Sequence, residues 1–160
     1  MGILERITRN IDNRCWDPGV KAFPVKNRYT AGVAGQKFFE EIKENGKIYG
    51  SRCEDCEITY LPARIYCERC FARLEENSWI DVGTEGTVYS YTVMHQTKSG
   101  EPREEPALIA AVKIADSLLI HRLGGCQPED VFIGLPVRAE FKPKDQRQGG
   151  IEDIVHFLPL

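Results

Sequence analysis

Short apolar stretches separated by polar turns run through the second half of the chain, from Gly86 onward. In GTVYSYTVMHQ, every second residue from Thr87 through Tyr89 and Tyr91 to Val93 falls on one face, which is typical of a half-buried strand. ALIAAVKIA is almost continuously apolar, as a central strand is, and SLLIHRLGG, PVRAEFKP and IEDIVHFLPL complete a set of five. Turn sequences such as KSGEPREEP and KDQRQGG separate them. We therefore predict a five-stranded OB-fold barrel over residues 81–160, with a sandwich or an SH3-like barrel as the alternatives.

A helical period replaces the strand pattern in GQKFFEEIKENG, residues 35–46. Phe38, Phe39 and Ile42 form one apolar stripe, and charged residues cover the opposite face. Asn45-Gly46 is a typical helix end. The pattern predicts an amphipathic helix of about two to three turns. Its apolar stripe either packs on the chain's own domain or faces a partner.

The first 34 residues show no sustained period and predict an irregular basic arm. Over residues 1–30, six Lys or Arg stand against three Asp or Glu, a local excess of three positive charges. Such an arm either docks on a partner or on phosphate groups, or packs its aromatic residues on its own domain. The basic residues are Arg6, Arg9, Arg14, Lys21, Lys26 and Arg28.

Two Cys-x-x-Cys pairs lie ten residues apart in CEDCEITYLPARIYCERC. Two such knuckles facing each other give a tetrahedral all-sulfur site that suits structural zinc, although the same ligands also suit iron. A thioredoxin-like redox motif would need a βαβ pattern, which is not visible here. The predicted metal ligands are Cys53, Cys56, Cys67 and Cys70.

The surroundings of the cysteines predict a small zinc ribbon, which together with the amphipathic helix spans residues 35–80. KIYGSR reads as a short strand leading into the first pair, and ITYLP and ARIY can supply the arms of a hairpin between the pairs. Glu57 and Phe71 follow the two pairs, at positions where glycine is easier to accommodate. The overall expectation is a mainly β chain: helix, rubredoxin-like ribbon, then barrel.

Composition narrows the class of protein. The chain has 160 residues, 42% hydrophobic and 28% charged, as in ordinary globular proteins. No stretch approaches the roughly 20 apolar residues that span a bilayer, and the first residues carry no apolar signal region. Six cysteines, four of them clustered, favour a local metal site over a disulfide framework. We expect a cytoplasmic protein that has no membrane partner.

No catalytic constellation stands out. His121 and His156 lie within predicted strands, His95 lies at a strand end, and Cys126 lies in a loop without a base beside it in sequence. Nucleic acid is an unfavourable partner because the chain carries 21 Lys or Arg against 24 Asp or Glu. The central strands ALIAAVKIA and SLLIHRL also lack the aromatic residues on which bases stack.

The order of parts resembles a known family. CEDC and CERC, with Pro62 and Arg64 between them, are followed by GTVYSYTV at the start of the barrel. This combination is similar to the OB-fold acyl-CoA-associated proteins with an N-terminal rubredoxin-like zinc ribbon, over roughly residues 35–158. Where the family often has a pair of prolines before the arginine, Leu61-Pro62-Ala63-Arg64 keeps one.

The resemblance implies a non-catalytic subunit of a thiolase-like acyltransferase complex whose partner chain carries the catalytic residues. Coenzyme A or an acyl-CoA would then be a ligand of the complex, with the basic arm beside its phosphates. The expected partner or coenzyme surface includes Phe38, Phe39 and Ile42, and also Arg64 and Tyr91. The alternatives are a zinc-ribbon and OB-fold nucleic-acid binder, and a stand-alone acyl-CoA carrier or hydrolase.

Overall fold

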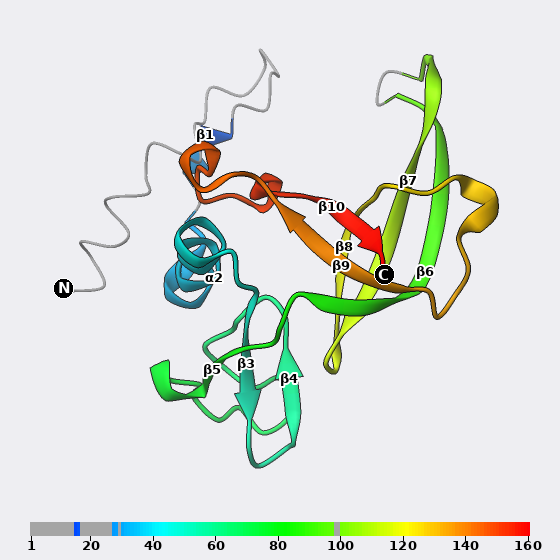
Figure 1. Cartoon of the computed structure of the whole chain (residues 1–160). Coiled ribbons are helices and arrows are strands. Elements are labelled where there is room, and N and C mark those ends of the chain that lie inside the picture. The colour runs from blue at the N-terminus through cyan, green and yellow to red at the C-terminus, as the bar shows by residue number, and fades with distance from the viewer. Residues whose placement is uncertain (1–14, 17–26, 29, 98–99) are drawn as a thin grey trace.

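The computed structural model describes residues 15–16, 27–28, 30–97 and 100–160 (Figure 1). These residues are mainly β, as predicted, and contain one α-helix, which leads to a small ribbon and then to a barrel. Most of the predicted arm lies outside the described residues, so its irregular character and basic role stay predictions. Two short strands of that region, β1 (Cys15–Trp16) and β2 (Asn27–Arg28), pair with each other in antiparallel fashion.

The amphipathic helix α2 (Gly32–Asn45) is longer than the sequence pattern predicts. It begins at Gly32 instead of Gly35, so the expected boundary between arm and ribbon at residue 34 falls inside the helix. The helix ends at Gly46 as predicted, because Gly46 adopts the left-handed conformation with φ of 62°. The Gly46 N–H donates to the Ile42 carbonyl at 3.2 Å, and the Lys47 N–H donates to Glu41 at 3.2 Å.

A three-stranded antiparallel sheet forms the ribbon, in the order β4-β3-β5. Its strands are β3 (Tyr49–Cys53), β4 (Ile58–Tyr60) and β5 (Trp79–Asp81), and the 3-10 turn η2 (Glu76–Ser78) leads into β5. The predicted strand in KIYGSR is present as β3. The predicted hairpin between ITYLP and ARIY is wrong, because β4 pairs back onto β3 in the register Cys53↔Ile58. The ARIY segment contributes only one bridge, Tyr66↔Arg73.

Five strands close into a barrel in the order β10-β8-β7-β6-β9, which confirms the predicted OB-fold architecture. The strands are β6 (Glu85–Gln96), β7 (Pro102–Ile114), β8 (Ser117–Leu123), β9 (Pro136–Phe141) and β10 (Ile154–Pro159). Three 3-10 turns connect them: η3 (Pro128–Asp130), η4 (Lys144–Gln146) and η5 (Ile151–Asp153). All neighbouring strands are antiparallel except β8 and β10, which meet in parallel at Leu123↔Phe157.

The first barrel strand departs from the simple alternation expected for it. A bulge between Val88 and Ser90 shifts the register, so that Tyr91 lies opposite Ala110 and Val93 opposite Leu108. Tyr89 is therefore not on the face of Tyr91. Strand β7 also begins at Pro102, within the stretch predicted to be a turn. The hairpin of β6 and β7 is thus longer than expected (Figure 1).

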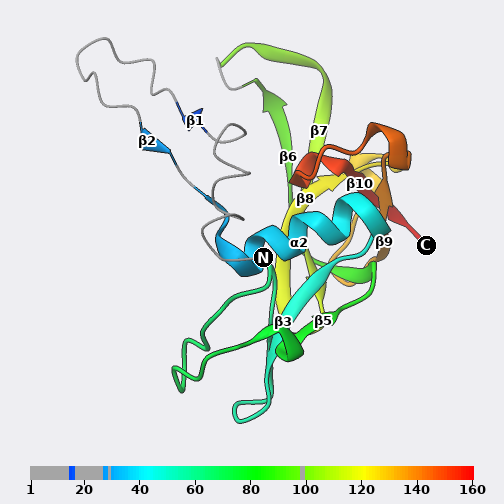
Figure 2. The same ribbon diagram turned by 90° about the vertical axis from the view of Figure 1, so that its left-hand side faces the viewer.

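The helix and the barrel share one hydrophobic core (Figure 2). Phe38 is 2% exposed and Ile42 is fully buried, and both belong to the cluster that includes Val112 and Phe157 of the barrel. Leu61, just after β4, joins the same cluster. The helix therefore packs Phe38 and Ile42 on its own domain, which is one of the two arrangements that the sequence pattern allows.

Arg147 joins the barrel to the end of α2. Its Nη1 lies 3.4 Å from the carbonyl oxygens of both Ile42 and Lys43, and its Nε donates to the Lys142 carbonyl at 2.7 Å. A cation at this position is favourable because the C-terminal carbonyls of a helix carry partial negative charge. The guanidinium also lies over the ring of Phe141, 5.5 Å from its centroid.

Asp153 organises the loop that carries Arg147. It is 1% exposed and accepts hydrogen bonds from the backbone N–H groups of Gln148, Gly149 and Gly150, the shortest at 2.6 Å. Burial alone would raise the pKa of this carboxyl, but the three N–H donors and the nearby Lys142 ammonium outweigh it and lower the pKa below its ordinary value.

We expect Asp153→Asn to lower the free energy of unfolding at neutral pH by about 2 kcal/mol, because an amide accepts these N–H groups less well than a carboxylate. The stabilisation belongs to the ionised form, so it is present above the ordinary aspartate pKa and is lost as the pH falls through the lowered folded-state pKa. Urea unfolding at a series of pH values measures this. Equal pH dependence in the wild type and the variant would rule the explanation out.

Among the described residues, no helix has both the length and the apolar character that a bilayer span requires.

Candidate metal centre

The ribbon brings the four predicted ligands together. Cys53 ends β3 and Cys56 follows in the turn to β4, while Cys67 and Cys70 lie in the loop before β5. After each pair the chain turns through a left-handed residue, Glu57 with φ of 55° and Phe71 with φ of 59°. These are the two positions at which the sequence suggested that glycine would fit better, so both knuckles form without it.

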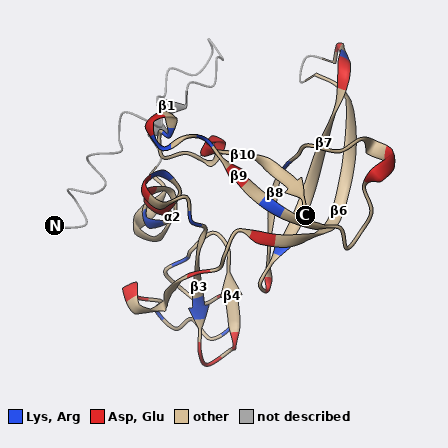
Figure 3. Ribbon diagram, in the orientation of Figure 1, with Lys and Arg blue, Asp and Glu red and all other residues tan. Residues whose placement is uncertain are grey.

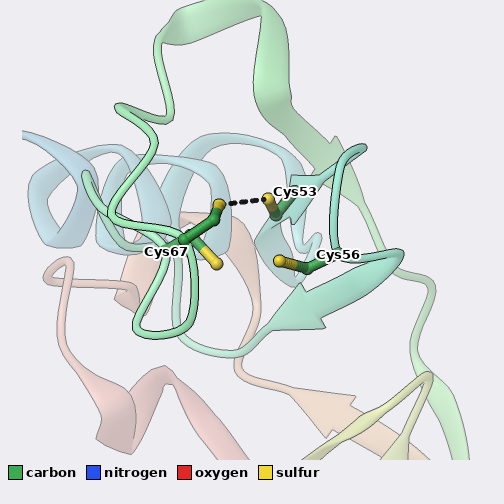
Figure 4. A group of neighbouring side chains, drawn as sticks. Cys53, Cys56 and Cys67 are labelled. Atoms are coloured by element: carbon green, nitrogen blue, oxygen red, sulfur yellow. Dashed lines mark hydrogen bonds between the residues drawn. The ribbon is translucent and has the colours of Figure 1, made fainter.

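The sulfur atoms of the four cysteines all lie within 4.8 Å of one another. Figure 4 shows the side chains of Cys53, Cys56 and Cys67 turned toward a common centre, and the sulfurs of Cys53 and Cys70 are 3.5 Å apart. A tetrahedral site with zinc–sulfur bonds of about 2.3 Å needs sulfurs about 3.8 Å apart. The cluster therefore has the donor set and the size of a four-thiolate zinc site, with all four positions taken by protein.

Hydrogen bonds shift the pKa values of the cysteine thiols in different directions. Donation from the backbone N–H of Cys70 and from the Tyr60 hydroxyl lowers the pKa of the Cys67 thiol to about 6, against the opposing effect of burial. The contact with the Cys70 sulfur, followed by burial, raises the pKa of Cys56 to about 12. A bound divalent cation favours the thiolate at every ligand. The Cys67 sulfur is thus held by hydrogen bonds from the protein itself.

The other expected surface residues are scattered. Phe39 is partly buried against the shared core, next to Phe38 at 5.2 Å between ring centroids. Arg64 lies on the ribbon, where it is ion-paired with Glu68 at 2.9 Å and stacked over the Tyr60 ring at 5.0 Å. Tyr91 is 39% exposed on the barrel strand β6. The three residues thus belong to the helix, the ribbon and the barrel, and their role at a partner or coenzyme surface stays a prediction.

The histidines do not assemble into a catalytic set within the described part of the chain. His156 Nε2 lies 2.6 Å from a Glu140 carboxylate oxygen, and His95 is exposed on β6. His121 is half-buried, with Nε2 3.3 Å from the Ile151 carbonyl, and burial lowers its pKa. Cys126 is half-buried, and burial raises the pKa of its thiol. The group with the clearest chemical purpose is the cysteine cluster.

Two features of the structure have no clear signal in the sequence. Several large apolar side chains are exposed on the ribbon, the barrel and the loop before β9; the most exposed are Phe71 at 78%, Ile133 at 71% and Ile120 at 70%. A strictly alternating reading of SLLIHRL would have placed Ile120 outside, because Leu119 and Leu123 point inward. The Tyr60 hydroxyl, 3.1 Å from the Cys67 sulfur, had no signal in the sequence beyond its place between the pairs.

Together the fold and the cluster define a zinc-ribbon protein with an OB-fold barrel. Two family models match this division: the rubredoxin-like zinc ribbon domain of ChsH2 over residues 41–75, and the C-terminal OB-fold domain of ChsH2 over residues 79–142. A DUF35 domain-containing scaffold protein of Methanocaldococcus jannaschii is 33% identical over 125 residues, which is 76% of this chain and 88% of that protein. The chain therefore belongs to the DUF35 family, which confirms the resemblance drawn from its sequence.

Further relatives agree with this assignment. A DUF35 domain-containing scaffold protein of Methanothermobacter thermautotrophicus is 24% identical, covering 71% of this chain and 86% of that one. The crystal structure of a DUF35-family protein of Sulfolobus solfataricus is 30% identical, with a TM-score of 0.55 over 69% of this chain and 78% of that one. A chain of the Ltp2-ChsH2(DUF35) aldolase shares the fold, with 24% identity and a TM-score of 0.60 over 82% of this chain and 98% of that chain.

Proposed function

We propose that this chain is the non-catalytic, zinc-binding subunit of a thiolase-type acyl-CoA acyltransferase complex. Its partner makes or cleaves a carbon–carbon bond in an acyl-CoA and supplies the nucleophile and the bases. This chain helps to shape the path of coenzyme A and bridges subunits. The observation that carries the proposal is the cluster of four cysteines, whose sulfurs can fill all four positions around a zinc ion. The described residues contain no assembled catalytic set beside it.

The relatives support a scaffolding role. Two of them are named as scaffold proteins, and one structure with the same fold is part of an aldolase, an enzyme class that acts on carbon–carbon bonds. The acyl-CoA substrate and the thiolase-like partner follow from the resemblance of the ribbon and the GTVYSYTV strand to acyl-CoA-associated proteins. Zinc holds the ribbon in this proposal, since a site of four cysteines closes on the metal and leaves no position for substrate.

Exposed apolar side chains are consistent with a chain that works against a partner. Phe71, Ile120 and Ile133 are each more than two thirds exposed. Exposed apolar surface of this kind often marks protein contacts. The charges on the described surface are of both signs, and the ribbon carries acidic as well as basic residues (Figure 3). A surface of mixed sign is poorly suited to follow a phosphate backbone, which argues against the nucleic-acid alternative.

Co-expression with a thiolase-type chain tests the proposal. We expect the two chains to purify together and native mass measurement to give a stoichiometric complex that contains zinc. Retention of the isolated chain on heparin or DNA is the parallel measurement, and we expect little retention. A chain that ignores the thiolase-type protein and instead binds DNA in a strongly salt-dependent way would contradict the proposal and favour the nucleic-acid alternative.

A further inference from the structure

Tyr60 connects strand β4 to a metal ligand. The side chain is 4% exposed, and its hydroxyl lies 3.1 Å from the Cys67 sulfur. The backbone N–H of Glu68 donates to the same hydroxyl at 3.3 Å, which leaves the hydroxyl proton for the sulfur. Cys67 itself is fully buried. The hydroxyl is therefore a fixed donor to the most enclosed of the four ligands.

The residues on both sides of Tyr60 are held by the barrel. Ser117, at the start of β8, donates its hydroxyl to the Thr59 carbonyl at 2.7 Å and accepts from the Leu61 N–H at 3.1 Å. Strand β4 is an edge strand of the ribbon sheet, so these backbone groups have no neighbouring strand on that side. The Ser117 hydroxyl of the barrel instead provides a hydrogen-bond partner for both the Thr59 carbonyl and the Leu61 N–H.

We propose that Tyr60 is a positioning residue for the metal ligand Cys67, and that Ser117 of the barrel acts on the metal centre through it. Three consecutive residues, 59–61, then carry the connection: the outer two bind Ser117 and the middle one binds the ligand. Ser117 of the barrel fixes the backbone on both sides of Tyr60. This backbone places the Tyr60 hydroxyl within hydrogen-bond distance of the Cys67 sulfur. The zinc affinity of the ribbon thus depends on a contact with the barrel that lies outside the ribbon.

The physical basis is the behaviour of outer hydrogen bonds around metal sites. A donor to a ligating atom fixes its orientation and stabilises its charge, and loss of such a partner typically weakens metal binding by about 10-fold to 100-fold. Tyr60→Phe removes the hydroxyl and keeps the buried ring. Ser117→Ala removes the hydrogen bonds to Thr59 and Leu61 and leaves all four cysteines and Tyr60 unchanged.

Competition for zinc with a chromophoric chelator, performed on the full chain, measures the affinity. We expect Tyr60→Phe to bind zinc about tenfold more weakly than the wild type. Tyr66→Phe is the matched control, because Tyr66 belongs to the same ribbon and is 53% exposed, and we expect it to bind zinc as the wild type does. Wild-type affinity in Tyr60→Phe would overturn the proposal.

Cobalt substitution separates a direct effect on the ligand from a general loss of stability. Removing a hydrogen bond from a thiolate makes its electrons easier to excite toward the metal. We therefore expect the sulfur-to-cobalt charge-transfer band of Tyr60→Phe to move to longer wavelength, while that of Tyr66→Phe stays in place. An unmoved band in Tyr60→Phe would contradict a bond between this hydroxyl and a metal ligand.

The Ser117 step is tested by combining variants. We expect Ser117→Ala to weaken zinc binding severalfold in the wild-type background and to have no further effect in the Tyr60→Phe background, since its influence passes through the Tyr60 hydroxyl. Equal effects in both backgrounds would overturn the connection. These measurements concern the isolated chain and zinc alone, so their outcome is separate from whether the chain joins a thiolase-type partner.

Discussion

We expect replacement of Cys67 with serine to unfold the ribbon and to abolish retention of zinc by the chain. The ribbon's own buried cluster is small, formed by Cys53, Tyr60, Cys67 and Leu74 with two partly buried neighbours. Two of its members are metal ligands, so little apolar packing remains when the site is lost. A structural zinc site contributes about 10–16 kcal/mol of apparent binding free energy at neutral pH, and that energy is the folding energy of small ribbons.

Metal analysis and amide exchange measure this result. After dialysis against a chelator, we expect the wild type to retain about one zinc per chain and Cys67→Ser about none. In the variant we also expect amide protection to be lost across β3, β4 and β5. Cys126→Ser is the control, because Cys126 lies outside the cluster, and it keeps both zinc and protection. A Cys67→Ser variant with full zinc content and a protected ribbon would show that the metal does not hold this part of the chain.

We expect Phe38→Ala to have the second largest effect, a loss of about 3–5 kcal/mol in the free energy of unfolding. Phe38 is 2% exposed in the core that α2 shares with the barrel, so truncation leaves a cavity between them. Phe39→Ala is the matched control on the next residue of the same helix. Phe39 is only partly buried against that core, and its truncation costs markedly less.

Urea unfolding of the two variants shows whether the apolar stripe of α2 packs on the barrel or is free to face a partner. The structure predicts a large difference between Phe38→Ala and Phe39→Ala. If both variants unfolded at the wild-type midpoint, α2 would not be packed on the barrel in solution. The stripe would then be free for a partner.

The sequence predicted the parts of this fold that depend on local pattern. The spacing of four cysteines identified one cluster because two knuckles leave few other ways to place the sulfurs. The end of α2 was predicted from Asn45-Gly46, since glycine accepts the left-handed conformation that ends a helix. The five barrel strands were found because apolar stretches and turn residues alternate at short intervals.

What the sequence did not predict depends on contacts between distant residues. The bulge after Val88 shifts which side chains of β6 point inward, and a period of two cannot reveal an extra residue. Ser117 reaches Thr59 across 58 positions of sequence, and Arg147 reaches Ile42 across 105. No single-sequence pattern encodes such pairs. The burial of Phe38 and Ile42 was left open for the same reason: an apolar stripe does not say what covers it.

Thioester turnover by the zinc-loaded chain, measured alone and then with its thiolase-type partner, tests the central claim of a scaffold for chemistry performed elsewhere. We predict no acyl-CoA cleavage or condensation by the isolated chain at any concentration. Turnover should appear only when the partner is added, and should rise until the two chains are stoichiometric. Turnover by the purified chain with no second polypeptide present would contradict the account.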